Sequence, residues 1–192
     1  MPFGTLTTEM VDAIRHVVQG QIVWDLGAGD LWYATELLHL GAAQVIAVDK
    51  ERLRDGVEIP EGCTFARMGF HHVQAPPEGF DVAFLSWPTN YMAPGLVPLL
   101  EAARTVIYLG ANTGGSACGD SRLWDHFAQR RIEVYVPCFR NSLIVYGEYC
   151  GWYERPMVGE EIGATCGVML TFEEAEARAK WLQEVLKDDE TR

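Results

Sequence analysis

Two acidic residues and two glycines in the first quarter of the chain have the types and spacing of a nucleotide-type binding site. Asp25 precedes Gly27 and Gly29 in the segment DLGAG, which follows a short apolar run. Glycine lets the backbone turn tightly and approach a ligand closely. Asp49 lies 22 positions after Gly27, near the spacing of about 20 residues at which an acidic residue binds ribose hydroxyl groups in βαβ units. The pattern predicts a ligand-binding turn at the carboxyl end of a strand.

The dinucleotide fingerprint is only partly present around this turn. G-x-G-x-x-G would require a third glycine at Trp32, and a carboxylate at Asp25 would lie unfavourably near a pyrophosphate. The loop therefore favours a ligand without phosphate over NAD. A glycine turn that only connects a strand to a helix is the alternative for the loop taken alone.

The elements expected to position these residues alternate between helix and strand. We expect helices at 8–19, 31–40, 96–103 and 122–130, and strands at 22–24, 45–48, 64–67, 80–85 and 105–109. Continuous apolar runs such as 45–48 are typical of strands covered on both faces. Strands at 132–137 and 142–149 are too close in sequence for a parallel crossover and predict an antiparallel hairpin. Five βα units and this hairpin predict a doubly wound α/β fold, with a mostly parallel seven-stranded sheet and helices on both faces.

The bulk composition is that of one globular domain. The chain has 192 residues, 48% of them hydrophobic and 22% charged, which suits a single domain over 1–192. A capping box, Thr171 with Glu174, opens a last helix expected at 170–187 and packed on the domain. No apolar run is long enough to cross a bilayer, and five scattered cysteines without a signal peptide predict a cytoplasmic protein without membrane association.

The charge and the histidines narrow the expected partners. A net charge of −12 opposes binding to a phosphate backbone, so we do not expect a nucleic-acid substrate. We interpret the two dense basic spots, Arg130-Arg131 and Arg52/Arg54, as solvated helix ends. Neither the cysteines nor the adjacent His71 and His72 have metal-ligand spacing, so no metal site is expected.

The strand, turn and helix around DLGAG resemble motif I of the class I S-adenosylmethionine (SAM)-dependent methyltransferases. The resemblance implies that Asp25 suits the amino group of the methionine moiety and that Asp49 binds the ribose. Many such methyltransferases have a third glycine where this chain has Leu31, and an acidic residue that binds adenine after the third strand, where this chain reads RMGF. The implied cofactor is SAM, and the cofactor-binding candidates are Asp25, Gly27, Ala28, Gly29, Asp49, Lys50, Met68 and Gly69.

The segment FDVAFLSWP, residues 80–88, resembles the fourth-strand motif of the same family. There a polar residue and a proline-containing turn hold the target nitrogen. Ser86 and Trp87 are therefore the candidate residues on the acceptor side, with Asn90 and Tyr91 just beyond them. His71, expected at the same edge of the sheet, is a candidate general base.

The resemblance implies methyl transfer from SAM to a small molecule or a protein side chain. Two alternatives remain open. The departures at Leu31 and after the third strand favour a catalytically inactive methyltransferase-like protein that binds a ligand or serves as a structural subunit. An NAD-dependent oxidoreductase is the third hypothesis, and Trp32 opposes it.

Overall fold

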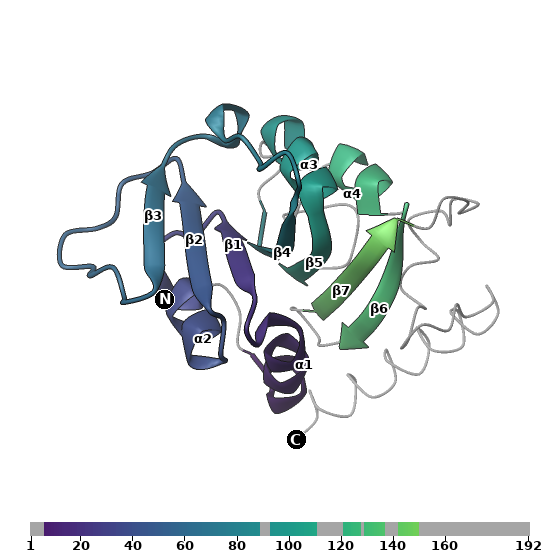
Figure 1. Ribbon diagram of the computed structural model, residues 1–192, viewed down its shortest axis with the longest axis horizontal. Helices are drawn as coiled ribbons and strands as arrows, with labels where there is room; N and C mark the ends of the chain where they lie inside the picture. The colour runs from purple at the N-terminus through teal and green to yellow at the C-terminus, as the bar shows by residue number, and fades with distance from the viewer. Residues whose placement is uncertain (1–5, 89–92, 111–120, 128, 137–141, 150–192) are drawn as a thin grey trace, which may run out of the picture.

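The protein is described by a computed structural model that covers residues 6–88, 93–110, 121–127, 129–136 and 142–149 (Figure 1). The helices are α1 (Thr8–Val18), α2 (Trp32–His39), α3 (Ala93–Ala102) and α4 (Ser121–Phe127), with a 3-10 turn η1 (Phe70–His72). The strands are β1 (Ile22–Leu26), β2 (Gln44–Asp49), β3 (Cys63–Arg67), β4 (Phe80–Ser86), β5 (Ala103–Gly110), β6 (Arg130–Val136) and β7 (Ser142–Tyr149).

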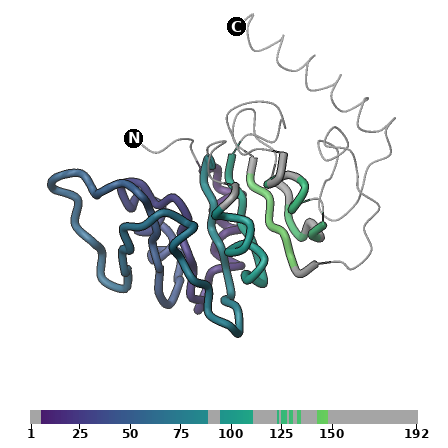
Figure 2. The backbone as a smooth tube through the Cα atoms, turned by 90° about the horizontal axis from the view of Figure 1, so that it is seen from above, coloured from purple at the N-terminus to yellow at the C-terminus, as the bar shows by residue number. Residues whose placement is uncertain are grey.

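The strands form one seven-stranded sheet in the order β3-β2-β1-β4-β5-β7-β6. All neighbouring pairs are parallel except those of β7, which is antiparallel to both β5 and β6. The chain moves outward from β1 to β3 and then returns to β4 on the other side of β1 (Figure 1, Figure 2). The prediction of a doubly wound, mostly parallel sheet with a terminal antiparallel hairpin is confirmed.

Helices cover both faces of the sheet, as predicted. On one face α1 and α2 pack Met10, Ile14 and Leu37 against strand residues that include Val45. On the other face α3 and α4 pack residues that include Leu99 against the sheet. Each large aliphatic side chain buried in this way stabilises the fold by roughly 1.5–3 kcal/mol. These two cores fix the central strands, and with them the loops at their carboxyl ends.

The first helix shows how closely local signals set the boundaries. Thr7 precedes α1 and accepts a hydrogen bond of 3.3 Å from the Met10 amide at its side-chain oxygen. Gly20 follows the helix with φ of 74°, a left-handed conformation that suits glycine. The helix predicted at 8–19 is confirmed to within one residue.

Arg130 corrects the prediction for the second half of the chain. The helix expected at 122–130 ends at Phe127, and Arg130 is the first residue of β6, with 2% of its surface exposed. Its Nη2 atom donates hydrogen bonds of 2.6 Å to the carbonyl oxygens of Leu100 and Ala103. The end of a helix leaves carbonyl groups without partners, and Arg130 supplies donors at the end of α3. Its interpretation as a solvated helix end is wrong.

Two further expectations need correction or lie outside the structure. Arg52 and Arg54 are exposed in the loop 50–62 between β2 and β3, and this loop contains no helix. Neither residue is therefore a helix end, and β2 is not followed by the helix of a βα unit. Asn90, Tyr91 and the helix expected at 170–187 lie outside the described residues. Within the described part of the chain, no helix has the length and apolar character needed to span a membrane.

Candidate functional site

The glycine turn lies across the carboxyl ends of β1 and β2. The two strands are in parallel register, with Leu26 opposite Val48. Beyond them, the amides of Gly27 and Ala28 both donate to the Val48 carbonyl oxygen, at 2.8 and 3.1 Å. Gly27 and Gly29 have φ angles of 93° and 52°, and a Cβ atom at Gly29 would meet nothing within 4 Å. The turn thus needs glycine for its conformation and leaves the space above Gly29 open.

Asp49 joins this turn to the end of β2. Its Oδ2 atom accepts a hydrogen bond of 2.9 Å from the Gly29 amide, and its Oδ1 atom accepts one of 2.8 Å from the Glu51 amide. Because each carboxylate oxygen has two lone pairs and Asp49 is only partly buried, it can accept further hydrogen bonds from ligand hydroxyl groups. The structure thus joins the glycine turn to Asp49, the acidic residue that the sequence predicts to belong to the same ligand-binding site.

The remaining cofactor candidates lie near Asp49 with different exposure. Lys50 is exposed. The Met68 amide donates 2.8 Å to the Asp49 carbonyl oxygen, and the Met68 side chain is 38% exposed. A Cβ at Gly69 would lie 2.8 Å from Cε1 of the exposed His71 side chain, which would have to shift to admit it. Met68 therefore offers an accessible apolar surface beside Asp49.

Asp25 is the most unusual residue of the site. Its side chain is fully buried in β1, and neither carboxylate oxygen has a hydrogen-bond partner among the described residues. Burial, and secondly the negative charge of Asp49, raise the pKa of Asp25 from 3.8 to about 7. The nearby charge of Asp25 also contributes, after burial, to a pKa of about 12 for Tyr33. A buried carboxylate of this kind favours a cationic partner.

Leu31 ends the glycine turn in a conformation that normally belongs to glycine. Its φ and ψ angles are 62° and 16°, and its side chain is 1% exposed. The sequence identified Leu31 only as a departure from the family pattern. The structure shows that the backbone still adopts the left-handed shape there.

The acceptor-side candidates lie at the end of the neighbouring strand. Phe84 of β4 is opposite Asp25 of β1, so Ser86 and Trp87 extend beyond the level of Asp25 at the same edge of the sheet. Both are half-buried. Trp87 has φ of 46°, and its amide donates 2.8 Å to the Leu109 carbonyl oxygen. The Trp87 side chain packs against the core cluster that includes Leu26 of β1 and Val48 of β2.

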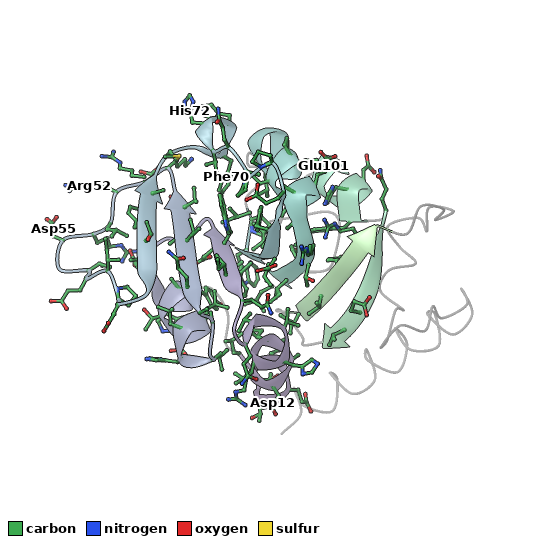
Figure 3. All side chains as sticks on the ribbon, in the orientation of Figure 1. Asp12, Arg52, Asp55, Phe70, His72 and Glu101 are labelled. Carbon is green, nitrogen blue, oxygen red and sulfur yellow. The ribbon has the colours of Figure 1, made fainter. Side chains whose placement is uncertain are left out.

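His71 lies in the η1 turn after β3, away from these contacts. It is exposed, and its ring centroid is 4.0 Å from that of His72. Figure 3 shows His72 projecting outward from η1, whereas Phe70 points toward the body of the protein and packs on its core. The structure thus places His71 at the predicted edge, and among the described residues no hydrogen bond or ion pair joins its side chain to Ser86 or Asp49.

An ion pair that the sequence did not predict lies beside the turn. Arg54, from the loop between β2 and β3, is 3.1 Å from Oδ2 of Asp30, which follows Gly29. Their side chains are 74% and 35% exposed. The two residues are 24 positions apart, with α2 and β2 between them, so no local periodicity could have paired them. The pair attaches that loop to the glycine turn, beside the hydrogen bond from Gly29 to Asp49 of β2.

The comparisons with known proteins bear on the fold. No protein-family model and no curated protein sequence matches the chain. Several solved structures do, among them a protein of Pyrococcus horikoshii proposed to be an RNA methyltransferase, with a TM-score of 0.55 and 13% identity over 74% of this chain and 82% of that one. A SAM-dependent methyltransferase of Aquifex aeolicus matches with a TM-score of 0.53 and 13% identity, over 72% and 87%. A ribosomal protein L11 methylase of Lactobacillus delbrueckii subsp. bulgaricus matches with a TM-score of 0.52 and 17% identity, over 78% and 82%.

These likenesses agree with the strand order and the reversed β7. The chain has the fold of the class I SAM-dependent methyltransferases, as the resemblance in its glycine turn predicted.

Proposed function

We propose that this protein binds SAM and transfers its methyl group to a nucleophile. The observation that carries the proposal is the hydrogen bond between Asp49 and the Gly29 amide. It places an acidic residue with spare acceptor capacity beside an open glycine turn, at the carboxyl end of parallel strands where α/β folds bind ligands. In this proposal Asp49 binds the ribose hydroxyl groups, and Gly27, Ala28 and Gly29 support the methionine part. Lys50, Met68 and Gly69 would lie toward the adenine.

Asp25 supports SAM rather than a dinucleotide. A buried carboxylate without a donor is unfavourable, and an ammonium group would supply both charge and donors. SAM carries such a group on its methionine moiety, whereas NAD carries a pyrophosphate, which a carboxylate repels. Trp32 is 39% exposed at the first position of α2, where the dinucleotide fingerprint has its third glycine. The NAD alternative is therefore disfavoured on two separate grounds.

Bound SAM supplies an electrophilic methyl group on a sulfonium. The role of the protein is then to place the acceptor in line with that group, which is a matter of orientation. Ser86 and Trp87, at the end of β4, are the residues that we propose to hold the acceptor. The left-handed backbone of Trp87 supports this role, because strained conformations of bulky residues cluster at functional sites. His71, exposed in η1, is the candidate to receive the acceptor's proton.

The charge of the chain and the structures with the same fold bear on the class of the methyl acceptor. The net charge of −12 favours a small molecule or a protein side chain. Two structures with this fold are described as a methylase of ribosomal protein L11 and a proposed RNA methyltransferase. The first agrees with a protein acceptor, and the second opposes the expectation that nucleic acid is not a substrate. We therefore include RNA among the acceptors to be tested.

A non-catalytic ligand-binding role is the second candidate. Its support is the stretch Arg67–Met68–Gly69 at the end of β3, which lacks a carboxylate for the adenine amino group. Such a protein would bind SAM or S-adenosylhomocysteine but transfer no methyl group. Incubation with methyl-labelled SAM and pooled small molecules, peptides or RNA separates the two roles, because only an enzyme would label an acceptor.

Isothermal titration of the wild-type protein with SAM, S-adenosylhomocysteine and NAD tests the proposal. The expected result is micromolar binding of the first two compounds and none of NAD. Binding of NAD alone would overturn the proposal.

A further inference from the structure

Leu31 holds a backbone conformation that is unfavourable for any residue with a Cβ atom. Its φ angle of 62° lies in the left-handed region, which glycine adopts at little cost. Such a conformation persists in a leucine only where the surrounding structure enforces it. The side chain shows what enforces it, because it is 1% exposed and lies in the core beneath α2 with Ala28 and Ala34.

The backbone of Leu31 couples the glycine turn to the start of α2. Its amide donates 3.0 Å to the Ala28 carbonyl oxygen within the turn. Its carbonyl oxygen accepts hydrogen bonds from the Thr35 amide at 3.0 Å and from Oγ1 of Thr35 at 2.9 Å. Leu31 thus connects the turn to the helix through its backbone and to the core through its side chain.

The other residues of the turn are also attached before any ligand binds. Gly27 and Ala28 are bonded to Val48, Gly29 to Asp49, and Asp30 to Arg54. A loop that is already ordered loses less conformational entropy when a ligand binds, and this raises affinity. Leu31 is the large buried side chain at the end of this set, because Gly27 and Gly29 have no side chain and the buried Ala28 contributes only a methyl group.

We propose that Leu31 is a positioning residue for SAM, whose buried side chain keeps the glycine turn in its ligand-binding shape. The proposal rests on SAM binding as proposed above. Replacement by glycine removes the backbone strain and restores the pattern common in the resembling methyltransferases, yet it weakens binding because the turn loses its anchor.

The test is calorimetric titration of S-adenosylhomocysteine into the wild type, Leu31→Gly, Leu31→Ala and Leu31→Met. We expect Leu31→Gly to weaken binding about five- to tenfold through a less favourable entropy, and Leu31→Met to stay within about twofold of the wild type. Leu37→Ala is the matched control, because Leu37 is equally buried in α2 but lies beyond the turn. It should lower the stability of the fold and leave the affinity unchanged.

Amide hydrogen exchange gives a second readout of the anchoring role that does not depend on ligand affinity. Amide hydrogen exchange at Gly29 and Leu31 should become faster in Leu31→Gly and Leu31→Ala than in Leu37→Ala. If Leu31→Gly binds as tightly as the wild type, or more tightly, Leu31 only fills the core and the proposal is wrong. If the wild type binds no S-adenosylhomocysteine, the proposed function fails instead, and unchanged exchange at Gly29 would then reject the anchoring role separately. If Leu31→Gly does not fold, Leu31→Ala carries the same comparison.

Discussion

The Asp49 carboxylate accepts a hydrogen bond of 2.9 Å from the Gly29 amide, so the acidic end of β2 holds the turn that follows β1. The same side chain accepts a bond from the Glu51 amide. Asp49 therefore has a structural role in the free protein in addition to the proposed contact with ribose. The two roles can be separated, because only one of them depends on the ligand.

Replacement of Asp49 by alanine should lower the stability of the free protein only modestly. Two amides lose a charged acceptor, but the site is partly exposed and water can replace it, so we expect a loss of about 1–2 kcal/mol. Urea unfolding followed by circular dichroism measures this. Asp55→Ala in the exposed loop should leave the free energy of unfolding unchanged, and an equal loss in both variants would argue against the specific role of Asp49.

Asp25 should make the stability of the fold depend on pH. Its pKa is about 7 in the folded chain against 3.8 for the free side chain. Between these values the folded chain keeps a proton that the unfolded chain has lost. The contribution of Asp25 to the free energy of unfolding therefore falls as pH rises from about 4 to about 7, with a slope approaching 1.4 kcal/mol per pH unit, and is level above that range.

The substitution Asp25→Asn isolates this contribution. Its unfolding free energy should exceed that of the wild type by more at pH 8 than at pH 4, and this difference between pH values cancels effects of the substitution that do not depend on pH. If the free energies of unfolding of wild type and variant change with pH in parallel, the pKa of Asp25 is the same in the folded and unfolded chain, and its carboxylate is already ionised between about pH 4 and 7. A cationic ligand should also release protons from the wild type near pH 7, and titrations in buffers of different ionisation enthalpy would detect this.

Arg130 should be among the most costly residues to replace. Arg130→Met keeps an unbranched side chain but leaves the carbonyl oxygens of Leu100 and Ala103 without their donor. We expect a loss of about 2–5 kcal/mol in the free energy of unfolding. Arg104→Met is the control, because Arg104 is 68% exposed in its ion pair with Asp81 and should cost less than about 1 kcal/mol. Similar losses in the two variants would contradict the role given to Arg130.

The Arg54–Asp30 pair should affect ligand affinity weakly and in a salt-dependent way. Exposed ion pairs contribute about 0–1 kcal/mol, so Arg54→Ala should weaken S-adenosylhomocysteine binding by no more than about fivefold, and high salt should reduce the difference. Arg52→Ala provides the comparison, since Arg52 is equally exposed in the same loop but is paired with Asp55. Identical affinities for the two variants would show that the pair does not support the turn.

Much of the fold could be predicted from the sequence because its signals are local. Apolar runs such as 45–48 predict buried strands, and the short spacing before 142–149 allows only an antiparallel hairpin. The glycine turn and Asp49 could be paired for the same reason, since a βαβ unit fixes their spacing. These features needed no knowledge of long-range contacts.

The features that the sequence did not predict depend on contacts between distant segments. Arg130 looks like a surface residue until α3 places carbonyl oxygens beside it. The left-handed backbone of Leu31 could not be anticipated, because leucine rarely adopts it and only the packed core enforces it. The ion pair of Arg54 with Asp30 depends on how a helix-free loop folds back.

Titration of S-adenosylhomocysteine into the wild type, Asp49→Ala and Asp55→Ala tests the central claim most directly. We expect micromolar binding to the wild type and to Asp55→Ala. Binding to Asp49→Ala should be weaker by at least about tenfold, as expected for removal of a charged acceptor worth about 1.5–3 kcal/mol. Undiminished binding to Asp49→Ala, or no binding to a folded wild type, would contradict the proposed role of Asp49 in binding SAM.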